Sequence, residues 1–185
     1  SITVTSTADD KVEIDELMQM VLGAITATEA DVQRDSASDF SLARGTGSGV
    51  IINDDYATLS VSSPSAPEGN APAGGFIDFV VTLSNDVQGG VKVDYETLAD
   101  TAGTFDPDYV ARAGSLLFQG VRGEQLTVRV LTVGDSKVEP NELLQMALRR
   151  PRLRVPDREY SQFLLLDPPG VGTICTTRWA PAIVS

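Results

Sequence analysis

The sequence predicts an all-β fold, a sandwich or a barrel, on two observations. Apolar and polar residues alternate with a period of two after residue 56, which is the pattern of half-buried strands. Turn-forming residues interrupt this alternation roughly every ten residues, as in proteins built from several short strands. The 185 residues suffice for one domain or slightly more, with a sizeable core.

The alternation is clearest in the stretches VKVDYET (residues 91–97) and GFIDFVVTLS (residues 75–84). Further short strands are expected at residues 56–61, 115–118 and 126–133. The turns between the strands are expected at Pro67–Asn70, Gly74-Gly75, residues 84–86, Gly89-Gly90, Gly114 and Gly120. Residues 10–25 fit an amphipathic helix capped by Asp9 or Asp10 as well as they fit a strand, so periodicity leaves this segment open.

An internal repeat organises the chain. Residues 9–22 (DDKVEIDELMQMVL) align without gaps on residues 135–148 (DSKVEPNELLQMAL), with nine identical positions of fourteen. Residues 47–57 align in turn on residues 170–180. A period near 125 residues, from 135 − 9 = 126 and 170 − 47 = 123, suits a tandem array of β-sandwich domains. Because residue 1 corresponds to Thr127, the chain starts within a repeat. Either it is a piece of a longer chain, or another segment supplies the missing strands.

Several motifs of residues 56–185 carry a family resemblance when they are taken together and in order. They are the turn Glu68-Gly69-Asn70, the pairs Thr101-Ala102 and Asp108-Tyr109, the segment Gly114–Phe118 with Gly123-Glu124, the acidic segment Asp135–Leu148, and Gly172 with Ile174. This combination resembles the Calx-beta family of sodium–calcium exchangers, integrin beta subunits and bacterial surface proteins. The resemblance implies an immunoglobulin-like Greek-key β-sandwich. It makes residues 1–55 the C-terminal part of a preceding repeat and residues 56–185 one complete repeat, and it favours strands over helices at residues 13–22 and 142–148.

The same resemblance implies a calcium site, because the family gathers acidic residues from several loops at one end of the sandwich. In the complete repeat these residues are Glu68, Asp108, Asp135, Glu139 and Glu142, and in the first repeat they are Asp9, Asp10, Glu13, Glu16, Asp54 and Asp55. The complete repeat carries Thr177 and Arg178 where the first has Asp54 and Asp55, so its site looks degraded, and Arg178 could bridge to Glu139 or Glu142 instead. The first set lacks the strands that carry the counterparts of Glu68 and Asp108, so its alternative is a solvated acidic loop.

Composition excludes several functions. The net charge of −12 argues against binding to nucleic acid or to anionic membranes. No apolar run approaches the length of a membrane-spanning helix. The chain has no histidine and one cysteine, which excludes a Ser/His/Asp triad, a histidine metal ligand and an internal disulfide.

Five arginines lie between residues 149 and 158 (Arg149, Arg150, Arg152, Arg154 and Arg158). They are expected in a long connection before the last strand, either as a solvated loop or as a basic patch that pairs with the acidic loop of another copy.

The function expected from these observations is not enzymatic. The protein is interpreted as an extracellular or cell-surface structural or adhesive repeat, stiffened by calcium or assembled into a filament. Its expected partners are neighbouring Calx-beta-like repeats or other copies of itself, with strand complementation of the incomplete first repeat as one route. The alternatives are a calcium-sensing regulatory module and an accessory region of a secreted hydrolase.

Overall fold

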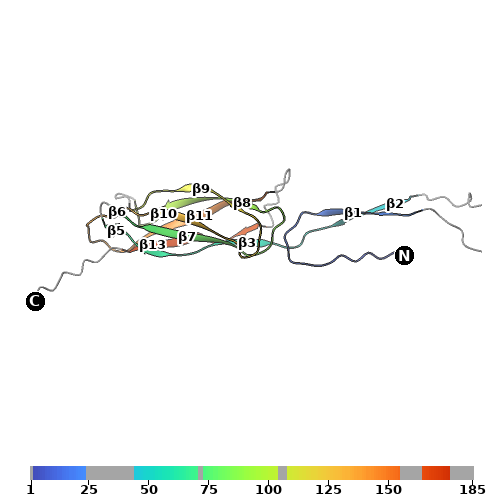
Figure 1. Cartoon of the computed structure of the whole chain (residues 1–185), viewed down its shortest axis with the longest axis horizontal. Helices are drawn as coiled ribbons and strands as arrows, with labels where there is room; N and C mark the ends of the chain where they lie inside the picture. The colour runs from blue at the N-terminus through green and yellow to red at the C-terminus, as the bar shows by residue number, and fades with distance from the viewer. Residues whose placement is uncertain (1, 24–43, 71–72, 104–107, 155–163, 176–185) are drawn as a thin grey trace, which may run out of the picture. The chain divides into compact units, whose positions relative to one another are not determined.

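The computed structural model describes residues 2–23, 44–70, 73–103, 108–154 and 164–175, and every regular element in these ranges is a strand (Figure 1). The all-β prediction is therefore confirmed. No helix in the described ranges has the length and hydropathy needed to cross a membrane. The chain forms two compact units. Unit 1 comprises Ser1–Ala8 and Ile14–Asn53, and unit 2 comprises Asp9–Glu13 and Asp54–Ser185.

Unit 2 is a β-sandwich of two sheets (Figure 1). One sheet has the order β10-β7-β3-β12, with β10 (Gln125–Leu131), β7 (Phe76–Leu83), β3 (Ala57–Val61) and β12 (Leu164–Leu166). The other has the order β4-β13-β11-β8-β9, with β4 (Ser65–Pro67), β13 (Gly170–Cys175), β11 (Glu142–Leu153), β8 (Val91–Ala99) and β9 (Ala113–Phe118). A small ribbon joins β5 (Gly69–Asn70) to β6 (Ala73–Gly74). The neighbours are antiparallel except β12 with β3 and β13 with β4.

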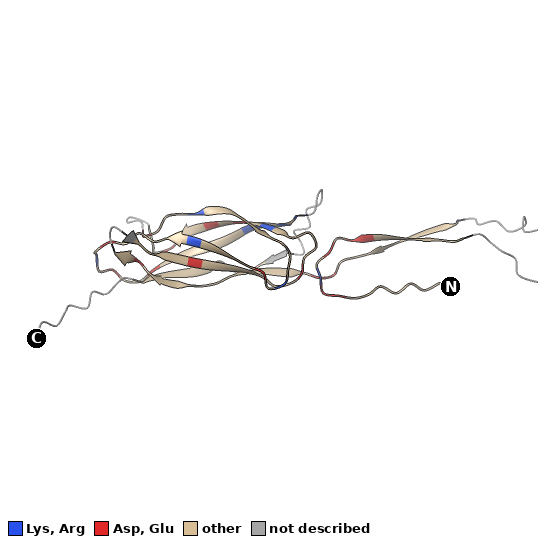
Figure 2. Cartoon of the chain, in the orientation of Figure 1, with Lys and Arg blue, Asp and Glu red and all other residues tan. Residues whose placement is uncertain are grey.

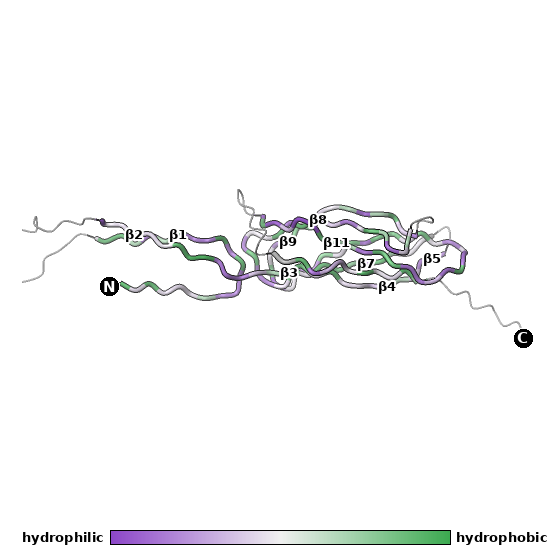
Figure 3. The backbone as a smooth tube through the Cα atoms, turned by 180° about the vertical axis from the view of Figure 1, so that it is seen from behind, coloured by the Kyte–Doolittle hydropathy of each residue, from purple (hydrophilic) through white to green (hydrophobic). Residues whose placement is uncertain are grey.

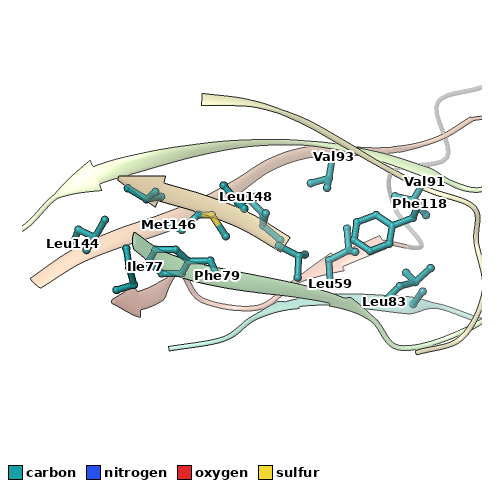
Figure 4. Packing of buried hydrophobic residues seen from close by; sticks show 14 of the residues in the cluster. Leu59, Ile77, Phe79, Leu83, Val91, Val93, Phe118, Leu144, Met146 and Leu148 are labelled. Atoms are coloured by element: carbon teal, nitrogen blue, oxygen red, sulfur yellow. The ribbon is translucent and has the colours of Figure 1, made fainter. Parts of the chain in front are cut away.

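The core of unit 2 lies between the two sheets, as the alternation predicted. On β7 every second residue from Ile77 to Leu83 is buried, and the residues between them are partly exposed. Figure 3 colours the backbone by hydropathy, and both hydrophobic and hydrophilic residues occur along the strands of unit 2. Phe79 and its neighbours meet side chains from β8 and β11 of the opposite sheet (Figure 4). Gly172 on β13 leaves room for this packing, because an added Cβ would lie 2.6 Å from Cζ of Phe79.

The expectation that the arginines from residue 149 onward lie in a connection is wrong for those at the end of β11. This strand runs to Leu153 and pairs with β8 from Leu144 onward, with a bulge between Arg149 and Arg152. Arg150 has a φ of 52° at the bulge. Pro151 is tolerated there because a bulge interrupts the ladder of hydrogen bonds.

The acidic partners of these arginines lie on the same unit, on the neighbouring strand β8 (Figure 2). Arg149 forms an ion pair with Glu96, and Arg152 lies 3.2 Å from Asp94. Pairing within the unit therefore replaces the predicted solvated loop for these two side chains. Arg158 lies outside the described residues.

The described part of unit 1 contains one antiparallel pair, β1 (Glu16–Val21) with β2 (Thr46–Ile51), so the helix alternative for this segment is wrong. Its register matches that of β11 with β13 position by position. The pairs from Glu16↔Ile51 to Met20↔Gly47 correspond to the pairs from Glu142↔Ile174 to Met146↔Gly170. The sequence repeat is thus also a repeat of strand pairing.

Candidate metal centre at one end of the sandwich

Five acidic residues of unit 2 come from three connections and one strand end. Glu68 follows β4, Asp108 lies between β8 and β9, Asp135 and Glu139 lie between β10 and β11, and Glu142 is the first residue of β11. The charges of Asp108, Glu139 and Glu68 all raise the pKa of Glu142, so these four carboxyl groups share one neighbourhood. Asp135 joins them through Glu68. We call these five residues the Glu142 cluster.

Glu68 is the most firmly held member of the cluster. It is only 4% exposed, and its backbone N–H donates to the carbonyl of Cys175 on β13 at 2.9 Å. Its carbonyl accepts from the hydroxyl of Thr132 at 2.7 Å, and its carboxylate accepts from the backbone N–H of Asp135 at 3.1 Å. Burial and the charges of Asp135, Asp108 and Glu139 raise its pKa, against the opposing effect of the Asp135 hydrogen bond. Sequence reasoning missed Thr132, which a carboxylate pattern cannot reveal.

Asp108 and Glu142 lie in contact within the cluster, with Asp108 buried and Glu142 partly exposed. Asp108 is 6% exposed, and its carbonyl accepts from the backbone N–H of Val133 at 2.8 Å. Burial, a hydrogen bond to Asp108 and the negative charges around it raise the pKa of Glu142 to about 7. Glu142 therefore keeps its proton to a higher pH than a solvent-exposed glutamate, because its ionised form lies partly desolvated among negative charges.

Few positive charges offset the cluster. Lys137 lies 3.5 Å from Asp135, but within the described ranges no basic side chain forms an ion pair with Glu68, Asp108 or Glu142. Nor do the described residues contain three or more acidic side chains at the spacing of a closed metal site. Thr177 and Arg178, which stand at the degraded position of the sequence motif, lie outside the described residues.

The first set of acidic residues is divided between the units. Asp9, Asp10, Glu13, Asp54 and Asp55 all belong to unit 2, whereas Glu16 lies on β1 of unit 1. The five in unit 2 share an electrostatic neighbourhood, because burial and the charges of the other four raise the pKa of Asp55.

Two of these carboxylates have basic partners. Lys11 Nζ lies 2.6 Å from Glu13, and Arg122 pairs with Asp10, which lowers the pKa of Asp10. Sequence reasoning missed Arg122, which is 112 residues away along the chain. This set is therefore partly neutralised by the protein's own side chains.

The fold and the site define the class of protein: a β-sandwich module with carboxyl groups gathered at one end. The family model of the Calx-beta domain matches residues 68–174, which is more than half of the chain. The chain therefore belongs to the Calx-beta family, in agreement with the resemblance of its motifs.

Solved structures share this fold at low sequence identity. The apo-form Calx CBD1 domain is 19% identical with a TM-score of 0.51, over 67% of this chain and 100% of that one. The Calx CBD2 domain is 18% identical with a TM-score of 0.51, over 69% and 91% of the two chains. The CBD12 structure from CALX1.2 is 20% identical with a TM-score of 0.51, over 64% and 45%. No match was found among curated proteins.

Proposed function

We propose that this protein is a non-catalytic Calx-beta module of a tandem array and that it binds calcium at the Glu142 cluster. The observation that carries the proposal is the gathering of five carboxyl groups at one end of the sandwich, where Glu68 and Asp108 are buried and the pKa of Glu142 is raised to about 7. Such a cluster favours either a proton or a cation, because uncompensated buried charge is costly.

The chemistry of the cluster fits calcium better than a softer metal. Calcium takes about six to eight oxygen ligands, mainly carboxylates and carbonyls, and tolerates irregular geometry. Glu68, Asp108, Asp135, Glu139 and Glu142 would hold the ion. In the absence of calcium, the proton on Glu142 reduces the negative charge of the cluster. A bound divalent cation would take over this role. The alternative source of positive charge is the side chain of Arg178, through the bridge to Glu139 or Glu142 that the sequence suggests.

The tandem array is supported by the matched registers of β1–β2 and β11–β13. In unit 2 the second edge of β11 pairs with β8, and the second edge of β13 pairs with β4. Strands of the same kind would complete the sheet around β1 and β2, where Leu17 and Val50 are exposed. Residues 1–55 are accordingly the last part of a preceding repeat. An extracellular or cell-surface array with a structural or adhesive role is the setting we propose, since the acidic balance and the single cysteine agree with it.

Calcium titration by calorimetry near pH 7 tests the cation site. We expect binding in the millimolar range or tighter, accompanied by release of a proton from Glu142, so the observed heat should vary with the ionisation enthalpy of the buffer. Glu142→Gln should weaken binding at least tenfold, because it removes a charged ligand from the cluster.

Asp167→Asn is the matched control, since Asp167 is an exposed acidic residue beyond β12. It should leave the titration unchanged. An absence of heat at millimolar calcium, or equal binding by wild type and Glu142→Gln, would refute the site.

A calcium-sensing module is the second candidate, favoured by the shared neighbourhood of Asp9, Asp10, Glu13, Asp54 and Asp55. Residues 9–13 precede β1 in the sequence, and Asp54 and Asp55 follow β2. A cation bound by both segments would link the chain before β1 to the chain after β2. A calcium-dependent change in small-angle scattering that Asp54→Asn and Asp55→Asn abolish would support this candidate. Scattering curves that do not respond to calcium would rule it out.

A further inference from the structure

Two copies of one loop differ sharply in burial. Residues 9–13 (DDKVE) and residues 135–139 (DSKVE) are equivalent in the repeat. Both adopt the same Asx turn: the backbone N–H of Lys11 donates to Asp9 at 3.1 Å, and that of Lys137 donates to Asp135 at 2.6 Å. Yet Val12 is 0% exposed and Val138 is 82% exposed.

Val12 is buried because it packs into the end of unit 2. Its N–H donates to the carbonyl of Asp86 at 2.9 Å, and its carbonyl accepts from the N–H of Gln88 at 2.8 Å. It forms a parallel bridge with Val87, and both side chains belong to the hydrophobic core of the unit. We call residues 85–90 and 120–122, which receive Val12, the valine socket.

Two glycines shape the valine socket. Gly120 has a φ of +93°, and an added Cβ would lie 2.1 Å from the carbonyl oxygen of Val87. Gly90 has a φ of +84°, and an added Cβ would lie 2.4 Å from the carbonyl oxygen of Phe118. The socket is therefore a close backbone arrangement that sequences without these glycines could not form. Arg122 adds a polar contact at its rim through Asp10.

The sequence after β13 indicates which partner Val138 would contact. Residues 180–185 (APAIVS) match residues 57–62 (ATLSVS), where β3 opens unit 2, at three of six positions: Ala57/Ala180, Val61/Val184 and Ser62/Ser185. The same offset of 123 residues, from 180 − 57, relates β2 to β13. Residues 180–185 therefore resemble the first strand of unit 2 in sequence.

We propose that Val138 docks into the valine socket of a third Calx-beta repeat that begins at Ala180. This inference rests on the tandem array proposed above and names the partner of an exposed residue of unit 2. A second copy of this chain does not offer a vacant socket, because Val12 already fills it within the same chain. In the aligned loops, Ser136 occupies the position of Asp10, which pairs with Arg122. Docking of the Val138 loop would therefore lack this ion pair and depend more on the apolar contact of Val138.

The test compares the full 185-residue chain with an extended chain in which a second copy of residues 57–185 follows residue 179. Serine is substituted for Val138 of the first copy, because a neutral side chain adds no charge beside Asp135 and Glu139. In the 185-residue chain Val138→Ser should shift the melting temperature by less than about 1 °C, since Val138 is exposed. In the extended chain it should lower the melting temperature by about 3 °C or more.

Two controls frame this comparison. Leu117→Ser, at an exposed position of β9, should have the same small effect in both chains, whereas Val12→Ser should destabilise both. Equal effects of Val138→Ser in the two chains would overturn the docking proposal. Sedimentation that shows dimers of the 185-residue chain, lost in Val138→Ser, would also overturn it, because the occupant would then be a second copy. Calcium binding by the unextended chain is measured separately, so failure of the cation site and failure of docking are distinguishable.

Discussion

Phe79→Ala is expected to lower the free energy of unfolding of unit 2 by about 3–5 kcal/mol. Phe79 is fully buried at the centre of β7, and its ring fills the space between the two sheets (Figure 4). Truncation removes the transfer free energy of the ring and leaves a cavity that the surrounding strands cannot fully close. A loss of this size is a large part of the total stability of an ordinary domain.

The matched control for Phe79→Ala is Phe76→Ala, on the same strand. Phe76 is largely exposed, and its ring lies under the Arg129 guanidinium at 5.1 Å, so we expect a loss of about 1 kcal/mol or less. Urea unfolding followed by circular dichroism and by amide exchange in unit 2 measures both variants. Similar losses for the two phenylalanines would contradict the assignment of β7 faces.

Gly172 refines the same prediction. An added Cβ at Gly172 would lie 2.6 Å from Phe79 and 2.8 Å from Ile77, so Gly172→Ala alone should be strongly destabilising. In a Phe79→Leu background the Cζ position is vacated, and the cost of Gly172→Ala should fall. A double-mutant cycle measures this coupling, and additive effects would show that the two side chains do not compete for space.

Stability that falls as pH rises from 5 to 8 in the absence of calcium is the second large effect we expect. The pKa of Glu142 is raised from 4.5 in the unfolded reference to about 7 in the folded protein. The folded state therefore holds a proton that the unfolded chain releases above pH 4.5. The contribution is fully present below pH 4.5 and is lost as pH rises through about 7, with a total of about 2 kcal/mol after allowance for partial solvent access.

Glu142→Gln should reduce this pH dependence markedly, since a neutral amide cannot titrate. The lowered pKa values of Asp10, Asp78 and Asp94 act only at lower pH. The raised pKa values of Glu68 and Asp55 act in the same direction as that of Glu142, so a smaller slope should remain in the variant. Denaturant unfolding at several pH values, with Asp167→Asn as the control, measures the slope. A wild-type stability that is constant from pH 5 to pH 8, or a slope in Glu142→Gln as steep as that of the wild type, would contradict the assignment. Saturating calcium should also suppress the slope, because the cation displaces the proton.

The arginines at the end of β11 show where sequence reasoning was limited. Prolines at 151 and 156 and a dense basic run predict a loop. The strand continues because β8 offers a partner on one side and the bulge at Arg149/Arg152 absorbs Pro151. Cross-strand pairing of Arg152 with Asp94 depends on register, which no local pattern contains.

What the sequence by itself determined is the strand pattern, the repeat and the family. A period of two depends only on neighbouring residues, and the identity of residues 9–22 with 135–148 needs no coordinates. The motifs of the Calx-beta family also collect the acidic residues that form the Glu142 cluster. Their charges and spacing along the chain were readable, but their burial was not.

Only the tertiary structure decided which of two nearly identical loops is buried. Val12 and Val138 stand in nearly identical loops with the same Asx turn, yet one lies in the core and the other faces solvent. The difference comes from what lies opposite each loop, a set of contacts made by segments more than seventy residues away, such as Asp86 for Val12 (86 − 12 = 74). The pKa of Glu142 has the same origin, because desolvation and the Asp108 contact arise only when distant loops close over β11.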